Sequence, residues 1–453
     1  MKYILSLIWI SIFPYVCFPN THKKIQAQSV NDFLNSIGAN SSINKRGENL
    51  EKTIECTRYL GIRWLRSGYE DGTTMEVYKR LRNEAGIKFT YGLGSGGNNI
   101  SQLLNGAREI AALDALLAIE GNNEPNNWGI EYQGEKGGKA NTWMPLAKLQ
   151  RDLYYAVKND PLLKKYPVFG ISESGGMTDN VGLQYLRIPK GANTSMPDGT
   201  QYADYVNIHN YITHPSWDNG KIHDNQTWIS SSPFSDCKVD GLYNNHGLTW
   251  YKKHKGYNEN ELAALPKVTT ETGLVIDENI SEEQHGKLLL NLYLAQFKRG
   301  WSYTAIYILR DRSDEGGNQK FGFYTPNYTP RKAAIYLHNL TTILEDNKPT
   351  PKPGSLSYYI PNQPETVHDL LLQKSDGTYE LIIWGEKYTG GTDTIDIHFK
   401  KRYKSISIYN PLIGTDATQT LSKIKSLKLK LTDHPIIIEI NIIKKCFIMC
   451  YVW

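Results

Sequence analysis

Between residues 30 and 345, short apolar runs alternate with longer stretches in which apolar residues recur at helical spacing. This alternation predicts parallel strands joined by helices that cover the sheet. The expected strands cover residues 35–39, 62–66, 88–93, 115–120, 167–171, 205–209, 267–271 and 303–309. The expected helices include residues 50–60, 75–85, 101–111, 145–157 and 333–344.

One more helix has clear start and stop signals. Ser281 and Gln284 have the spacing of a capping box, and Gly300 occupies the place of a C-terminal cap. With it, eight strand–helix pairs can be drawn, which is the number in a (β/α)8 TIM barrel. We therefore predict the α/β class, with a barrel over residues 28–346.

The pattern changes after residue 346. Residues 347–354 form a proline-rich linker, and beyond it the apolar runs are short and separated by turns such as Asp376-Gly377. The expected strands cover residues 355–359, 369–373, 379–384, 393–399, 405–409, 426–431 and 436–440. They predict a small antiparallel β-sandwich over residues 355–441. The apolar tail, residues 442–453, is too short to span a membrane.

The first residues have the pattern of a signal peptide. A charged start, Met1-Lys2, precedes an apolar run over residues 4–18 that is too short for a membrane span. We expect a leader over residues 1–27 and a secreted or periplasmic protein. Lipid anchoring at Cys17 is not favoured, because no small residue precedes it. Secretion permits disulfides, and the sequence leaves their pairing open.

Composition and motifs exclude several function classes. The net charge of +5 is small for 453 residues, and no long Lys/Arg run suggests a nucleic-acid partner. The Gly-x-Gly-x-x-Gly pattern of residues 92–97 follows the third strand and lacks the acidic partner of a dinucleotide site, so it is better explained as a loop. Neither Gly-x-Ser-x-Gly nor His-Glu-x-x-His occurs. We expect no cofactor and no metal.

Two carboxylate motifs carry the functional signal. Glu124 lies in Asn123-Glu124-Pro125 after the fourth expected strand, and Glu271 lies in Thr270-Glu271-Thr272-Gly273 at the end of the seventh. The carboxyl ends of barrel strands meet at one face, which is where TIM-barrel active sites lie. Two facing carboxylates, one protonated and one ionised, are the groups that glycoside hydrolysis requires.

These two motifs resemble the signature pair of the clan A glycoside hydrolases, which are retaining (β/α)8-barrel enzymes. The resemblance implies that Glu124 is the acid/base, that Glu271 is the nucleophile and that Asn123 binds the sugar 2-hydroxyl. Residues 60–66 resemble the clan's second strand, whose terminal arginine, here Arg66, supports the nucleophile.

Further positions extend the resemblance. His209-Asn210-Tyr211 is similar to the His-x-Tyr of the sixth strand, which implies that Tyr211 donates to Glu271 and that His209 binds sugar hydroxyls. Residues 321–324 and 329–334 resemble the eighth-strand loop and the start of the last helix. One position departs from the clan: many members have a Trp at the end of the eighth strand, where this chain has Tyr307. We expect Tyr307 or Trp128 to form the floor of the sugar site.

Other residues near the motifs have weaker signals. Glu120 is better explained as a salt-bridge partner near the site than as a catalytic group, and Glu173 is a candidate substrate contact. Candidate sugar-stacking platforms are the tryptophans of the expected top loops, Trp128, Trp143, Trp217, Trp228 and Trp250.

The sequence as a whole predicts a secreted, cofactor-free, retaining glycoside hydrolase that cleaves a β-linked oligo- or polysaccharide. A transglycosylase using the same site is the alternative within enzymes, and a non-catalytic carbohydrate-binding barrel is the alternative outside them. The sequence leaves open the sugar, the linkage, exo or endo cleavage and the oligomeric state.

Overall fold

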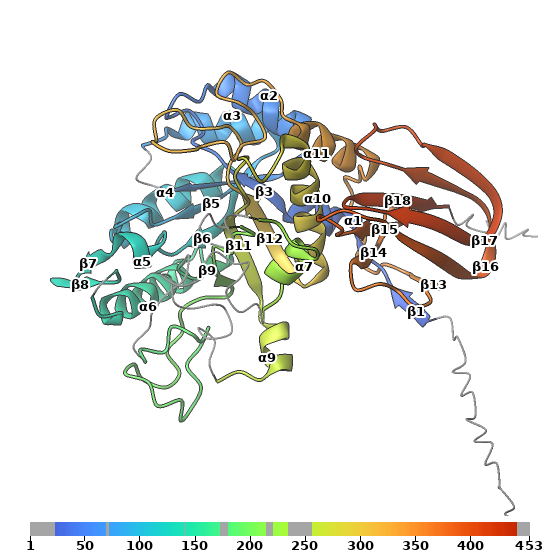
Figure 1. Ribbon diagram of the computed structural model, residues 1–453. Helices are drawn as coiled ribbons and strands as arrows, with labels where there is room; N and C mark the ends of the chain where they lie inside the picture. The colour runs from blue at the N-terminus through green and yellow to red at the C-terminus, as the bar shows by residue number, and fades with distance from the viewer. Residues whose placement is uncertain are drawn as a thin grey trace, which may run out of the picture.

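The computed structural model describes residues 23–68, 72–139, 141–172, 180–213, 221–233 and 256–441. Eight parallel strands follow one another around a barrel in chain order (Figure 1). Pairing of the last strand with the first, together with a bridge between Phe169 and Tyr205, completes the ring. These strands are β3 (Ile37–Asn40), β4 (Trp64–Gly68), β5 (Lys88–Gly92), β6 (Leu116–Glu120), β9 (Val168–Phe169), β10 (Val206–Asn207), β11 (Lys267–Thr272) and β12 (Trp301–Ile306).

Helices surround the barrel, and the predicted TIM-barrel fold is confirmed. The covering helices are α1 (Val30–Ser36), α2 (Leu50–Leu60), α3 (Met75–Ala85), α4 (Ile100–Ala112), α6 (Met144–Asn159), α10 (Glu282–Lys298) and α11 (Lys332–Ile343). The capping box expected before α10 is present, with Ser281 and Gln284 each bonding the other's backbone N–H. Between β9 and β10, residues 180–205 form turns instead of a helix. Gly182, Gly191 and Gly199 have positive φ in this segment, a conformation that interrupts a helix.

Short elements are inserted between consecutive barrel strands. A hairpin of β7 (Ile130–Tyr132) and β8 (Glu135–Gly137) follows α5 (Pro125–Trp128). The connection from β10 to β11 contains α7 (Gln226–Ser230) and α9 (Glu259–Ala264). These insertions leave the order of the barrel strands unchanged.

The second domain is an eight-stranded, mainly antiparallel sheet. Its strands are β1 (Lys23–Gln26), β2 (Gln28–Ser29), β13 (Ser355–Tyr359), β14 (Val367–Gln373), β15 (Tyr379–Gly385), β16 (Asp393–Tyr409), β17 (Gln419–Leu431) and β18 (Pro435–Ile440). The two strands expected over 393–399 and 405–409 are the halves of the single long strand β16, which has an irregularity between His398 and Tyr403. The C-terminal β domain is thus confirmed.

The start of the described chain belongs to the β domain. β1 pairs antiparallel with β13, and β2 pairs parallel with β14. Ala27 is buried in the core of this domain. The leader expected over residues 1–27 therefore overlaps β1, while residues 1–22 and the apolar tail over 442–453 lie outside the described residues.

The β domain packs on the barrel through strands that are buried on both faces. Ile382 and Trp384 of β15 belong to the core shared with the barrel, whereas Leu381 and Ile383 belong to the domain's own core. This period-two alternation is the strand geometry expected between two apolar layers. The two domains therefore share a continuous core. No helix among the described residues is long and apolar enough to cross a membrane.

Candidate active site

A cleft of about 610 Å³ opens where the barrel strands end. Glu124 and Glu271 both line it, as does Arg66 from β4. This is the face on which the residues of TIM-barrel active sites gather. Six of the nine residues predicted for the site, Arg66, Asn123, Glu124, His209, Tyr211 and Glu271, are linked to one another by hydrogen bonds or ion pairs.

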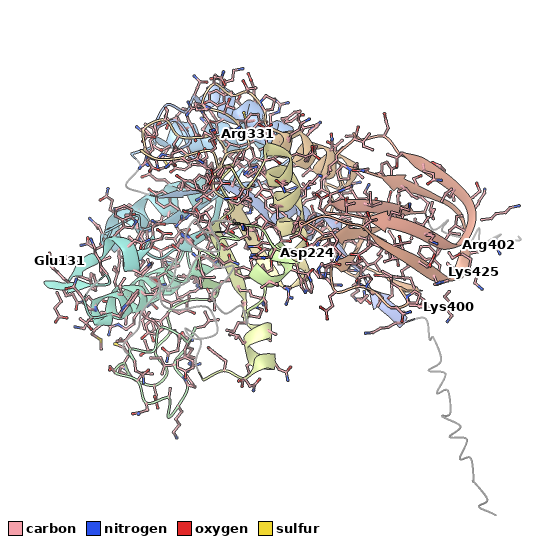
Figure 2. The ribbon with its side chains drawn as sticks, in the orientation of Figure 1. Glu131, Asp224, Arg331, Lys400, Arg402 and Lys425 are labelled. Carbon is pink, nitrogen blue, oxygen red and sulfur yellow. The ribbon has the colours of Figure 1, made fainter. Side chains whose placement is uncertain are left out.

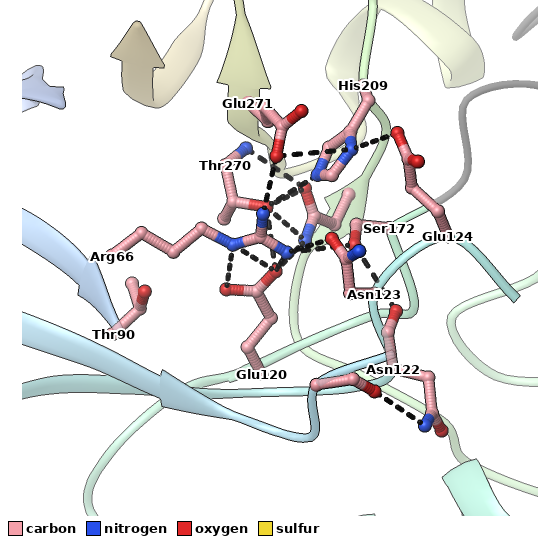
Figure 3. Close-up of polar contacts among 12 residues, drawn as sticks. Arg66, Thr90, Glu120, Asn122, Asn123, Glu124, Ser172, His209, Thr270 and Glu271 are labelled. Atoms are coloured by element: carbon pink, nitrogen blue, oxygen red, sulfur yellow. Dashed lines mark hydrogen bonds and ion pairs between the residues drawn. The ribbon is translucent and has the colours of Figure 1, made fainter. Parts of the chain in front are cut away.

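The Arg66 guanidinium occupies the centre of this network (Figure 3). Its Nη1 donates to Glu271 Oε2 at 2.9 Å, and its Nη2 donates to Asn123 Oδ1 at 2.9 Å. On the other side it contacts Glu120 through both Nε and Nη2, at 2.7–3.2 Å. Burial alone would lower the pKa of Arg66, but Glu120 and Glu271 raise it above its ordinary value. A permanent positive charge therefore sits between two carboxylates.

Glu271 is held by two donors, one on β4 and one in the loop after β10. Tyr211 Oη donates to Oε1 at 2.6 Å, while Arg66 holds Oε2. Burial and the neighbouring Glu271 charge raise the pKa of Tyr211 well above its usual value, so its hydroxyl keeps its proton. Donors on both oxygens favour the ionised form of a carboxylate.

Glu124 occupies a different environment. Its backbone has φ of 41°, the left-handed region that non-glycine residues rarely adopt, and Pro125 begins α5 directly after it. The Glu124 N–H donates to Ser172 O at 2.7 Å, which fixes the turn against the fifth strand. Asn127 Nδ2 donates to Oε2 at 3.0 Å, and Oε1 lies 2.9 Å from His209 Nδ1.

The hydrogen bonds of Thr270 indicate which His209 nitrogen carries a proton. The single hydroxyl hydrogen of Thr270 has two acceptors in reach, Glu120 Oε1 at 2.7 Å and Asn207 Oδ1 at 3.2 Å. The 3.2 Å contact from Thr270 Oγ1 to His209 Nε2 then needs a proton on Nε2. The contact between His209 Nδ1 and Glu124 Oε1 in turn needs one proton between those two atoms. Glu124 and His209 therefore share a proton. Glu271 has no such need, because Arg66 and Tyr211 donate to its two oxygens.

The spacing of the two catalytic candidates is short. A carboxylate oxygen of Glu124, a carboxylate oxygen of Glu271 and a ring nitrogen of His209 all lie within 4.8 Å of one another. The two carboxylate side chains are 15% and 16% exposed, so both reach the cleft. Three such donor atoms could also hold a divalent cation.

Several buried polar residues behind the site had no sequence signal of their own. Asn207 donates to Glu120 and to Thr270, and Ser172 accepts from Arg66 at 3.2 Å. The expectation that Glu120 is a salt-bridge partner agrees with its 2.7 Å contact to Arg66. Asn207 and Ser172 acquire their roles only because the closed barrel brings β9 beside β6 and β10 beside β9.

The other predicted contacts are distributed around the cleft. Trp128 is 62% exposed and lines the cleft with Glu124, and Tyr307 lines it near Glu271. Arg312, also in the lining, carries ion pairs to Asp314 and Glu315 and was not anticipated.

The remaining candidate positions are not placed in the cleft. Glu173, Trp217 and Trp250 lie outside the described residues. Trp143 is buried at the start of α6. Trp228 is stacked between Arg299 and His368. Trp143 and Trp228 are therefore packing residues rather than sugar platforms.

No protein-family model and no curated protein sequence matches this chain. Solved structures do match it closely in fold. A family 39 glycoside hydrolase from the gut symbiont Bacteroides cellulosilyticus WH2 superposes with a TM-score of 0.58 at 13% identity, covering 90% of this chain and 82% of its own. The GH51 α-L-arabinofuranosidase from Thermotoga petrophila RKU-1 gives 0.57 at 9% identity, covering 92% and 98%.

CelM2, a bifunctional glucanase-xylanase from a metagenome library, gives a TM-score of 0.53 at 11% identity, covering 93% of this chain and 97% of its own. The similarity thus extends over both domains. The predicted resemblance to the clan A glycoside hydrolases is confirmed at the level of fold.

Proposed function

We propose that this protein is a secreted glycoside hydrolase that cleaves a β-linked oligo- or polysaccharide with retention of configuration. The observation that carries the proposal is the approach of the Glu124 and Glu271 carboxylate oxygens to within 4.8 Å. Retaining enzymes place their two carboxyl groups about 5–5.5 Å apart, whereas inverting enzymes need about 6.5–9.5 Å to admit a water molecule.

The different surroundings of the two carboxylates support different roles. Glu271, with Arg66 and Tyr211 donating to its oxygens, is suited to attack the anomeric carbon as an ionised nucleophile. As the glycosidic C–O bond breaks, the proton held between Glu124 and His209 passes through Glu124 to the leaving oxygen. Glu124 then removes a proton from water, which attacks the glycosyl-enzyme and releases the sugar.

Other cleft residues are assigned to the substrate. Asn123 is oriented by Arg66 and by its own bond to Ser95, which leaves the second hydrogen of its amide for the sugar 2-hydroxyl, where a hydrogen bond gains strength in the transition state. The exposed indole of Trp128 offers an apolar platform for a sugar ring, and Tyr307 also lines the cleft. His209 is assigned to the proton of Glu124 rather than to sugar hydroxyls, because it is fully buried.

The fold neighbours supply the first substrates to test. They include an α-L-arabinofuranosidase and a glucanase-xylanase, so xylans, arabinoxylan and β-glucans head the panel. Proton NMR of the first-formed product reports its anomeric configuration. The retained anomer supports double displacement, and the inverted anomer overturns it.

Two variants separate the roles of the carboxylates. Glu271→Gln is expected to abolish turnover on every substrate. Glu124→Gln is expected to retain slow turnover on aryl glycosides whose leaving group needs no proton, and added azide should speed it and yield a glycosyl azide. Normal activity of Glu271→Gln would refute the nucleophile assignment. Products that contain an added acceptor sugar would instead identify a transglycosylase at the same site.

A further inference from the structure

A buried carboxylate of the β domain contacts a loop of the barrel. Glu386, directly after β15, is fully buried. Its Oε2 accepts from the backbone N–H groups of Thr227 and Trp228 at 3.1 and 3.2 Å. Its Oε1 accepts from Thr227 Oγ1 at 2.5 Å and from Trp384 Nε1 at 3.0 Å. Four donors from two domains thus converge on one side chain, and two of them are the backbone of α7.

The other end of α7 is bonded to the catalytic loop. Asn210 Nδ2 donates to Ser230 O at 3.0 Å, and Ser230 is the last residue of α7. Asn210 lies between His209 and Tyr211, and its own carbonyl accepts from Thr272 Oγ1 beside Glu271. Hydrogen bonds therefore connect Glu386 through α7 to Asn210. The backbone of Asn210 in turn joins His209, which contacts Glu124, to Tyr211, which contacts Glu271.

The side chains around Glu386 also hold α7 in a fixed position against the β domain. Arg299 stacks on the Trp228 ring at 3.8 Å, and His368 stacks on the same ring with its Nε2 4.0 Å from Glu386 Oε1. Burial lowers the pKa of His368 to about 3, so this imidazole is neutral. Tyr388, buried nearby, contacts Thr227 and accepts from Asn291 of α10. These contacts link α7, α10, β14 and the segment after β15 to one another around Glu386.

We propose that Glu386 is a positioning residue for the reaction, and that the β domain sets the geometry of the catalytic pair through α7 and Asn210. The effect on turnover rests on the proposed function. The effect on the position of His209 does not, because it is a property of the folded protein alone.

The test compares two buried glutamates of the same strand region. Glu386→Gln keeps the shape of the side chain but replaces one acceptor oxygen by an NH2 group that faces donors. Glu380→Gln is the matched control, because Glu380 is also fully buried but pairs with Lys374, away from α7. We expect Glu386→Gln to lower kcat by about tenfold or more with little change in KM, and Glu380→Gln to leave both unchanged. Equal losses in the two variants, or unchanged kcat in Glu386→Gln, would overturn the proposal.

A double-mutant cycle tests the route. If Glu386 acts through Asn210, the loss from Glu386→Gln should largely disappear in an Asn210→Ala background, because coupled residues are not additive. Fully additive losses would refute this route. If no substrate is found, the NMR titration of His209, assigned with a His209→Gln variant, gives an independent readout. It should shift in Glu386→Gln and not in Glu380→Gln, and an unshifted titration would count against the proposal.

A second surface is marked by charge. Residues 393–431 contain eight Lys or Arg and three Asp or Glu, so the rest of the chain has 43 of each and this segment accounts for the whole net charge of +5. All eight cationic side chains are exposed. We call them the basic ribbon of β16 and β17: Lys400, Lys401, Arg402, Lys404, Lys423, Lys425, Lys428 and Lys430. Lys400, Arg402 and Lys425 lie at the end of the β domain farthest from the barrel (Figure 2).

Protection of a sheet edge explains only part of this ribbon. β17 is an edge strand, and lysines there prevent pairing with other chains. β16 pairs with β13, β17 and β18 elsewhere along its length, and its four cations lie over residues 400–404, where its pairing with β17 is irregular, so they are not on the edge strand itself. Of the large apolar side chains exposed in the described residues, none lies in β16 or β17. Stacking on bases or insertion into a membrane would use such side chains.

We infer that the basic ribbon binds an acidic polysaccharide. That the occupant is a carbohydrate rests on the proposed function, whereas its negative charge rests on the ribbon alone. The triple variant Lys400→Glu/Arg402→Glu/Lys425→Glu is compared with Lys79→Glu/Lys164→Glu/Lys190→Glu, which makes the same change in net charge at other exposed lysines.

Both triple variants are made in the Glu271→Gln chain, so that no polymer is cleaved. Their migration is compared in affinity gels that contain polygalacturonate or neutral dextran. We expect polygalacturonate to retard the Glu271→Gln chain and salt to weaken this retardation. The ribbon variant should lose the retardation, and the control variant should keep it. Equal losses in both variants, equal retardation by dextran, or stronger binding to DNA or to anionic vesicles would overturn this inference. Activity of the unmodified enzyme on the substrate panel tests the proposed function separately.

Discussion

Arg66 is the residue on which the geometry of the site depends most. Its planar guanidinium contacts Glu120, Asn123 and Glu271 at once. A lysine at this position keeps the charge, but its donors radiate from one nitrogen instead of the planar fork of Nε, Nη1 and Nη2 that meets the three partners. We expect Arg66→Lys to lower kcat by about 10²–10³-fold, the usual effect of removing one fixed electrostatic donor. Steady-state kinetics on the best substrate check this, and a loss of less than about threefold would show that Glu271 does not depend on Arg66.

The residues proposed to be catalytic should also respond to added metal ions. The proposed reaction uses no metal, so EDTA is expected to leave the rate unchanged. An added zinc ion, however, could take one atom each from Glu124, His209 and Glu271, which lie within 4.8 Å of one another. We expect zinc to inhibit competitively with substrate and the His209→Gln variant to be less sensitive. Loss of activity in EDTA would contradict the assignment.

Individual elements differ in how far the sequence alone predicts them. Helices α2 and α3 occupy the predicted residues, because their apolar repeat and their caps are local signals. Strands β1 and β2 had no such signal, since they pair with strands more than 300 residues later in the chain. For the same reason Asn207 and Ser172 were missed, whereas Glu124 and Glu271 stand in recognisable motifs. Motifs identify residues that do chemistry, and the barrel's closure decides which residues support them.

The cap of α10 gives a prediction at the scale of one element. Ser281 accepts from the Gln284 N–H, and α10 carries Lys287 and Asn291 into the domain interface. Ser281→Ala should lower the free energy of unfolding by about 1 kcal/mol, the usual cost of losing such a cap. Urea unfolding measures this, with Ser281→Thr as the control that keeps the hydroxyl. kcat should be unchanged, since α10 does not reach the cleft.

At the scale of the whole molecule, β1 predicts where the mature chain begins. Removal of residues up to Ala27 would delete the strand that pairs with β13 and the bond from Ala27 N to Gly354 O. If the protein is secreted, as proposed, we expect the mature chain to retain Lys23–Gln26, with processing before Lys23. Intact-mass measurement of the secreted protein decides this. A mature chain that starts at Gln28 would show that the β domain does not need β1.

Buried titratable groups predict how the stability of the whole molecule varies with pH. Burial raises the pKa of Glu386 to about 7 and that of Glu380 to about 8, so the folded state binds protons more tightly than the unfolded state from about pH 4.5 upward. Their contribution to stability is complete below that pH and is lost as pH rises through 7 and 8. Burial also lowers the pKa of His285 to about 4 and that of His368 to about 3. These neutral histidines contribute stability above pH 6.5 that is lost as pH falls.

The two effects oppose each other between about pH 4.5 and 6.5, where we expect a plateau. Between pH 6.5 and 8 these histidines are neutral in both states, whereas the two glutamates still titrate differently. Burial lowers the pKa of Lys267 to about 8, so this lysine acts in the opposite direction only from the top of that range upward. The free energy of unfolding should then fall by up to about 1.4 kcal/mol per pH unit for each glutamate. Between pH 7 and 8 Glu380 alone remains, so Glu380→Gln should remove that part of the decline. Urea unfolding at pH 5.5, 6.5, 7 and 8 measures the profile. Stability that rises from pH 6.5 to 8 would show that these two carboxyls are ionised in the folded protein well below neutral pH.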